Sequence, residues 1–209
     1  MTRRELAARI SAGINDPDQV FLTPEELALS IDEAAETLAE QAGAVRRTVF
    51  VEQRPGTTYY HLHGIGPDLI APFRVWDHAR NVRLDSVSLA DLDERMRNWP
   101  TANGDPLCWF PVSWDLFGIW PRSTIGGGVL RLDCFAWPRS LMDDDDEPEL
   151  VAGDQDALVV YGAYEGLVKR LDAEKALEAW NEFSGRRTDV RGRAGTRMQA
   201  INLQRDTSR

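Results

Sequence analysis

The sequence predicts an α+β fold, a helical bundle with an inserted antiparallel β subdomain and an extended C-terminal arm. Helical periodicity marks both ends of the 209-residue chain, whereas β-forming residues and turn signals fill the segment from about 45 to 138. Strands and helices do not alternate regularly, as they would in a doubly wound α/β fold. The length suits one sizeable domain, expected over 1–185 and followed by the arm over 186–209.

The first part of the chain carries two helix-start signals. Thr2-Arg3-Arg4-Glu5 and Thr23-Pro24-Glu25-Glu26 both have capping-box spacing, in which the Thr and Glu side chains accept hydrogen bonds from free backbone N–H groups. Apolar residues follow each box at helical intervals. We therefore expect helices over about 3–13 and 24–42, the second of which ends at Gly43. Its many glutamates are typical of a solvated helix face.

The β subdomain begins with a change of period after residue 44. Segments 45–53 and 57–62 are rich in β-forming residues and flank the turn Arg54-Pro55-Gly56, which predicts a hairpin. Gly126-Gly127-Gly128 is expected to form a further hairpin turn, because it lies between two predicted strands. A phosphate-binding loop would instead need a helix N-terminus directly after the glycines. The other strands are expected over 69–76, 82–88, 107–113 and 129–137, with a helix over about 89–98.

Helical periodicity returns after Pro138. An apolar stripe predicts a helix over about 154–171, and Asp172 is a suitable N-cap for another over about 173–184. The tight link between them predicts an antiparallel pair. Beyond Ser184 the chain is polar and contains several glycines, which favours an extended conformation.

The charge of the chain is distributed unevenly. The formal net charge of −10 argues against a protein that wraps DNA in general, because such proteins neutralise phosphates with a basic face. From Ser184 onward, however, seven Arg stand against two Asp, a net charge of +5 that leaves −15 on residues 1–183. This pattern is typical of an arm that reaches an acidic partner, and equally of a solvated, disordered terminus.

Composition also indicates the compartment. No apolar run approaches the ~20 residues that a membrane helix needs, and the charged N-terminus does not resemble a signal peptide, so a soluble intracellular protein is expected. Cys108 and Cys134 have no metal-knuckle spacing and are expected to be buried in a reducing compartment. Cys134 is expected to share one strand face with Leu130, Leu132 and Ala136.

Few residues suggest chemistry. His61 and His63 would lie on one face of a strand, which is compatible with metal ligation, but no third ligand stands near them. A Ser-His-Asp triad would lack the usual nucleophile elbow. The sequence therefore predicts no enzyme, no metal and no cofactor. The alternative hypothesis is a small metal- or carbohydrate-binding module, based on the two histidines and the aromatic β segment.

Five adjacent acids stand between the β segment and the C-terminal helices. They lack the alternating ligands and the central Gly of an EF-hand loop, so we expect a solvated loop or a charged rim, which near a DNA path would repel phosphates. The five residues are Asp143, Asp144, Asp145, Asp146 and Glu147.

The order of several weak motifs is informative where no single motif is. In chain order they are Thr23-Pro24-Glu25-Glu26-Leu27, 54–62, Trp99, Gly104-Asp105-Pro106, Ile119-Trp120-Pro121, 130–137, 143–148 and 159–164. Together they resemble the head-to-tail adaptor (connector) proteins of tailed bacteriophages and related gene transfer agents. The likeness covers residues 2 to about 185, and the richness in Trp and the run of Asp depart from it.

The resemblance implies a structural protein of the virion neck, made in the host cytoplasm. Members form a twelve-membered ring below the portal protein, continue the channel through which double-stranded DNA passes without sequence-specific binding, and dock a stopper or tail protein. It also implies that the C-terminal segment is an arm that docks into the portal. The residues expected to carry that role here are Arg186, Arg187, Arg191, Arg193, Arg197, Met198, Ile201 and Leu203.

Overall fold

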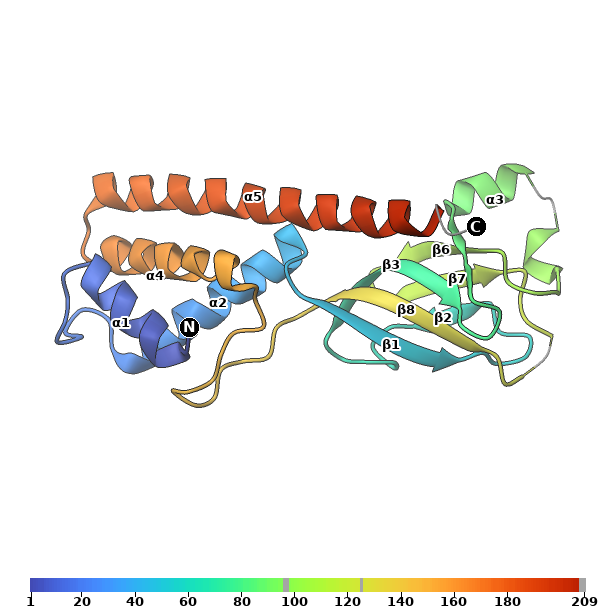
Figure 1. Ribbon diagram of the computed structural model, residues 1–209, viewed down its shortest axis with the longest axis horizontal. Coiled ribbons are helices and arrows are strands. Elements are labelled where there is room, and N and C mark those ends of the chain that lie inside the picture. Colours follow the sequence, from blue (N-terminus) through green and yellow to red (C-terminus); the bar gives the residue numbers. More distant parts are fainter. Residues whose placement is uncertain (96–97, 125, 207–209) are drawn as a thin grey trace. The chain divides into compact units, whose positions relative to one another are not determined.

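The computed structural model describes residues 1–95, 98–124 and 126–206, and it confirms the α+β class. The chain divides into two compact units, one formed by Met1–Val45 with Trp137–Arg209 and the other by Arg46–Ala136. The first unit is helical and the second holds the strands (Figure 1). The second unit is thus an insertion between two parts of the first.

The helical unit begins with the two expected capping boxes, which are both present at Thr2 and Thr23. Helix α4 packs against α1, α2 and α5. The elements are α1 (Arg3–Gly13), α2 (Pro24–Ala42), the 3₁₀ turn η2 (Ala152–Asp154), α4 (Asp156–Lys169) and α5 (Ala173–Asp206).

Helix α4 contacts its neighbours in two ways. Toward α1 it presents Gly162, where a β-carbon would come within 2.4 Å of Ile10 Cδ1, so the two helices approach very closely. Toward α5 it presents an aromatic face, with the Tyr161 and Phe183 ring centroids 5.0 Å apart. Asp172 caps α5 as expected, since its carboxylate accepts a hydrogen bond from Lys175 N–H.

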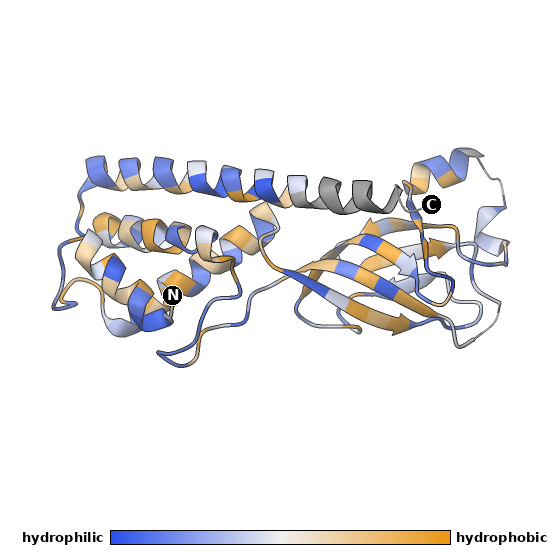
Figure 2. Ribbon diagram, in the orientation of Figure 1, coloured by the Kyte–Doolittle hydropathy of each residue, from blue (hydrophilic) through white to orange (hydrophobic). Residues whose placement is uncertain are grey.

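The C-terminal segment differs from the expectation, because α5 continues as a helix to Asp206 where an extended arm was expected from residue 186. Gly185, Gly192 and Gly195 each disfavour a helix interior by about 1 kcal/mol. Contacts with the rest of the helical unit offset this cost, because the side chains of Phe183 and Val190 are almost fully buried. Figure 2 shows that the coloured part of α5 is otherwise largely hydrophilic.

The inserted unit contains two four-stranded sheets. All neighbouring strands are antiparallel except β5 and β6. The first sheet has the order β1 (Arg46–Glu52), β8 (Val129–Ala136), β3 (Leu69–Asp77), β4 (Val82–Arg83). The second has the order β2 (Tyr59–His61), β7 (Leu116–Trp120), β6 (Cys108–Ser113), β5 (Asp85–Ser86). A short helix α3 (Leu89–Arg95) and a 3₁₀ turn η1 (Trp99–Thr101) complete the unit.

The first and last strands of the insertion pair with each other, with Arg46 opposite Phe135. The chain therefore enters and leaves the unit at neighbouring positions. On β8 the predicted face of Leu130, Leu132, Cys134 and Ala136 is confirmed, since all four are fully buried. Cys108 and Cys134 are free and buried, and burial raises their pKa values to about 11 and about 12.

Both predicted hairpins are wrong. β1 and β2 belong to different sheets, so the turn at Arg54-Pro55-Gly56 leads from one sheet to the other. The glycines Gly126-Gly127-Gly128 likewise lie between β7 and β8, which are in different sheets. In both cases the strand pairs with a strand distant in sequence and not with the one across the turn, because each strand also has to bury one face in a core.

Candidate docking surfaces

The arginines of α5 that were expected to form an arm lie on a helix, and three of them have partners. Arg186 donates to Glu182 Oε1 one turn earlier, at 2.7 Å. Arg187 Nη1 donates to Gln41 Oε1 of α2, at 2.6 Å. Arg193 Nη2 forms an ion pair with Asp154 of η2. Two of these contacts fasten α5 to other elements of the helical unit.

The Arg193 contact is the most protected of the three. The carboxylate of Asp154 is only 8% exposed, so the arginine compensates a charge that water reaches poorly. A small pocket of about 70 Å³ lies beside it, lined by Gly153, Asp154, Ala157, Arg186, Asp189, Val190 and Arg193. Four of these residues belong to α5, and the volume leaves no room for a large ligand.

Arg191 is also exposed, and unlike these three it forms no side-chain hydrogen bond or ion pair with another described residue. Beyond Arg193 the described side chains of α5 are also exposed, apart from half-buried Ala194. The side chains of Arg197, Met198, Ile201 and Leu203 lie outside the described ones. The structure therefore separates an anchored part of α5, which ends near Arg193, from the part that follows.

The acidic loop 143–147 lies against the start of α1. Arg3 and Arg4 donate their backbone N–H groups to the carbonyls of Asp146 and Asp144, at 2.8 and 3.0 Å. These N–H groups have no partner within their own helix, so the loop caps α1. Arg3 also forms an ion pair with Asp144 at 3.0 Å, and Arg4 one with Asp145 at 3.4 Å.

The loop still presents negative charge to solvent. The Asp145 side chain is 85% exposed and that of Asp144 is 56% exposed. Asp146 instead turns inward within the loop, where its Oδ2 accepts from the N–H groups of Met142 and Asp143, both at 2.9 Å. Only two of the five acids are paired with arginine, so the loop remains acidic.

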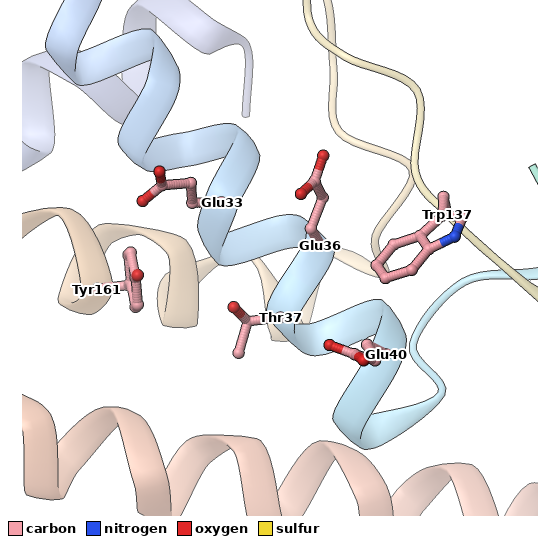
Figure 3. A pocket seen from close by; sticks show the side chains of 6 residues that line it. All are labelled: Glu33, Glu36, Thr37, Glu40, Trp137 and Tyr161. Atoms are coloured by element: carbon pink, nitrogen blue, oxygen red, sulfur yellow. The ribbon is translucent and has the colours of Figure 1, made fainter. Parts of the chain in front are cut away.

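A second acidic surface lies on α2 (Figure 3). A groove of about 250 Å³ is lined by Glu33, Glu36, Thr37, Glu40, Trp137 and Tyr161. The glutamates come from successive turns of α2, and Tyr161 comes from α4. The sequence predicts a solvated face for these glutamates. Their spacing of three and four residues was the available signal that they share one stripe.

The groove perturbs the titration of its neighbours. Partial burial raises the pKa of Glu165, and the nearby Glu33 carboxylate raises it further. Burial, followed by the charges of Glu165 and Glu33, raises the pKa of Tyr161 to about 12. Burial disfavours a charge of either sign, whereas the contributions of Glu33 and Glu165 reflect the negative charge of neighbouring carboxylates.

The two histidines do not share a strand face, because His61 ends β2 and His63 lies in the following turn. Both contact Asp115. Its carboxylate lies 3.1 Å from His61 Nδ1 and accepts from the backbone N–H of His63 at 2.6 Å. Within the described ranges no cluster of three His, Cys, Asp or Glu side chains suits a metal ion.

Comparison with known protein families identifies the family of the chain, which none of these surfaces does. A family model described as SU10 adaptor protein matches residues 1–206. The match thus includes the helical unit and the inserted β unit together. A comparison with curated proteins gives no match. Among the helices of the described chain, none has both the length and the apolar character of a membrane span.

Proposed function

Because the chain belongs to the SU10 adaptor protein family of phages, whose members are structural proteins, we propose that it is the head-to-tail adaptor of a virion neck. In this role it forms a ring, twelve-membered as in related adaptors, below the portal. It extends the DNA channel and docks a stopper or tail protein. The observation that carries the proposal is the family match, which extends over residues 1–206 and includes both units.

The end of α5 beyond Arg193 is the segment proposed to dock into the portal. Arg187 and Arg193 hold the preceding turns against the helical unit, so the helix is presented as a rod with a fixed direction relative to that unit. Arg191 and Arg197 would contribute positive charge to such a contact, and the apolar residues Met198, Ile201 and Leu203 are available in the same segment. A helix that is already formed loses less conformational entropy on docking than an extended arm does.

The acidic loop 143–147 is proposed as a rim of the DNA channel. Its exposed carboxylates on Asp144 and Asp145 would repel phosphates and keep DNA from adhering to the ring. The backbone contacts with Arg3 and Arg4 support this assignment, because they hold the charges in one place.

The test is attachment of purified adaptor to the portal protein encoded by the same phage. A chain ending at Thr196 is expected to stay folded by circular dichroism and to lose portal binding in a pull-down. Arg191→Glu is expected to weaken binding several-fold at low salt. The reason is that complementary charges across a protein interface speed association, and this substitution reverses one of them.

Lys175→Glu is the matched control, since it makes the same charge change near the other end of α5. It is expected to bind the portal as the unaltered chain does. Undiminished binding by the truncated chain would show that α5 does not dock. Absence of the full-length protein from purified virions would contradict the adaptor role itself.

A further inference from the structure

Both sheets of the inserted unit end in an open edge strand. β1 pairs only with β8 in the first sheet, and β2 pairs only with β7 in the second. An edge strand directs the backbone groups of every second residue away from its sheet. The hydrogen bonds at the strand ends show which residues these are.

For β1 the marker is Gln53, whose N–H donates to Gly128 O at 2.7 Å, in register with the pairing to β8. Because backbone groups alternate, Val49 and Val51 also face β8, and the N–H and C=O groups of Thr48, Phe50 and Glu52 point away from it. Those three residues make no backbone hydrogen bond to another described segment. Their side chains are exposed as well.

The same reasoning applies to β2. Leu62 N–H donates to Asp115 O at 2.8 Å and Ile119 N–H donates to Thr58 O at 2.9 Å, so residues 58 and 62 face β7. The backbone groups of Tyr59 and His61 therefore point away from that sheet. Two unsatisfied strand edges thus occur in the same unit.

The two edges line one groove. It has a volume of about 400 Å³ and contains Phe50, Val51, Glu52, Arg54, Thr57, Tyr59, Tyr60, His61, Gly64 and Ile65. Phe50 is 59% exposed and Tyr59 is 45% exposed, so the groove offers two aromatic surfaces that a bound chain would cover. A long edge strand with an exposed aromatic side chain is a template for pairing with another chain.

We propose that this groove binds an extended segment of a partner protein, which pairs with β1 as an additional strand. Its backbone would satisfy the outward N–H and C=O groups of Thr48, Phe50 and Glu52, a span that a segment of about five residues matches. A helix has no free backbone groups with this repeat. Residues of β2 line the same groove, so a strand added to β1 would also lie against them.

Side chains along the edge define the chemistry of the occupant. A residue opposite Glu52 is basic, because a charge of opposite sign stabilises a cross-strand pair. A residue opposite Phe50 is β-branched or aromatic for the same reason. The occupant is therefore an extended segment that places an apolar and a basic side chain two residues apart. This site is independent of α5 and goes beyond the proposed docking to the portal.

The test uses the full-length protein and a displayed library of short linear peptides. Selected peptides are expected to alternate apolar and basic residues, and to slow amide hydrogen exchange of Thr48, Phe50 and Glu52 in isotope-labelled protein. Each peptide is then N-methylated at every second residue, in the two alternative phases. One phase is expected to weaken binding about tenfold, because it removes backbone donors to β1, while the other has little effect.

Glu52→Lys is expected to weaken binding several-fold and to be rescued by a peptide with an acidic residue at the facing position. Glu178→Lys, the same charge change at an exposed position of the helical unit outside both grooves, is the control and is expected to have no effect. The proposal is overturned if no peptide is selected, if the protected amides lie elsewhere, or if both N-methylated phases bind equally. None of these outcomes depends on whether the chain attaches to a portal.

Discussion

Gly162 and Asp16 show how single residues hold the helical unit together. Gly162 lets α4 approach α1 until no space for a β-carbon remains against Ile10. Asp16 lies in the connection between α1 and α2, where its carboxylate accepts the backbone N–H groups of Val20, Phe21 and Leu22 at 2.9, 2.9 and 3.2 Å. Neither role is visible in residue type or hydropathy.

We expect Gly162→Ala to destabilise the protein by about 1–3 kcal/mol, because the added methyl group overpacks the contact with α1. Gly185→Ala is the matched control. A β-carbon at Gly185 meets nothing within 4 Å, so this change should stabilise α5 by roughly 0.5–1 kcal/mol. Urea denaturation of both variants measures the difference, and equal effects of the same sign would refute this account of α4.

The Asp16 carboxylate should also make the stability of the fold depend on pH. Burial by itself raises the pKa of Asp16, but the three backbone N–H groups and the charge of Arg170 together hold it below the ordinary value of 3.8. A lowered pKa means that the carboxylate stabilises the fold above the unfolded pKa and that this stability is lost as pH falls through the lowered value.

Asp16→Asn should therefore lower the melting temperature at pH 7, and the difference from the unaltered chain should shrink as the pH falls below 3.8. Asp18→Asn, an exposed acid in the same connection, should show a much smaller effect at either pH. Thermal unfolding at a series of pH values tests this. A difference that stays constant with pH would exclude the carboxylate as the cause.

At the scale of elements, α5 depends on a few contacts along a hydrophilic helix. In the middle of α5, the described side chains of Phe183 and Val190 are deeply buried. Arg187 forms a hydrogen bond with α2, and Arg193 forms one with η2. Isolated helices with several glycines are marginal in water. The length of α5 is therefore decided by these contacts, and the part beyond Arg193 is stabilised less.

Arg193→Ala tests this anchoring. It should destabilise the helical unit by about 1–3 kcal/mol, because it leaves the poorly exposed Asp154 carboxylate without its charged partner. Amide exchange should rise in α5 after Gly185. Arg191→Ala, two residues earlier on an exposed position, is expected to change stability by less than about 0.5 kcal/mol. Similar exchange in both variants would contradict the anchoring role.

At the scale of the whole molecule, the chain is one helical unit interrupted by one β unit. The two ends of the insertion are adjacent because β1 and β8 pair from Arg46 and Phe135 onward. Antiparallel neighbours of this kind have Cα atoms roughly 5 Å apart. A unit whose termini lie side by side disturbs its host little, since the host chain resumes near where it stopped.

Replacing residues 46–136 by a short Gly-Ser linker should therefore leave a folded helical protein. Circular dichroism should show a helical spectrum with cooperative thermal unfolding. Gly162→Ala should lower the melting temperature of the shortened protein as it does that of the full chain, which checks that the packing of α4 on α1 is unchanged. A non-cooperative transition would mean that the helices require the β unit.

The sequence alone determined the features that depend on neighbours within a few residues. The capping boxes at Thr2 and Thr23, the cap at Asp172, the alternation along β8 and the α+β class all follow from local spacing. The order of weak motifs also pointed to the adaptor family. Local backbone geometry and periodic burial are sufficient causes for the caps, the strand alternation and the fold class.

Only the tertiary structure decided which distant segments meet. It assigned β1 to β8 and β2 to β7, continued α5 past Ser184, and placed the acidic loop 143–147 on the first turn of α1. It also placed residues of β1 and β2 in the lining of one groove. Strand pairing and helix length depend on burial against partners far along the chain, and that energy leaves no mark in local spacing.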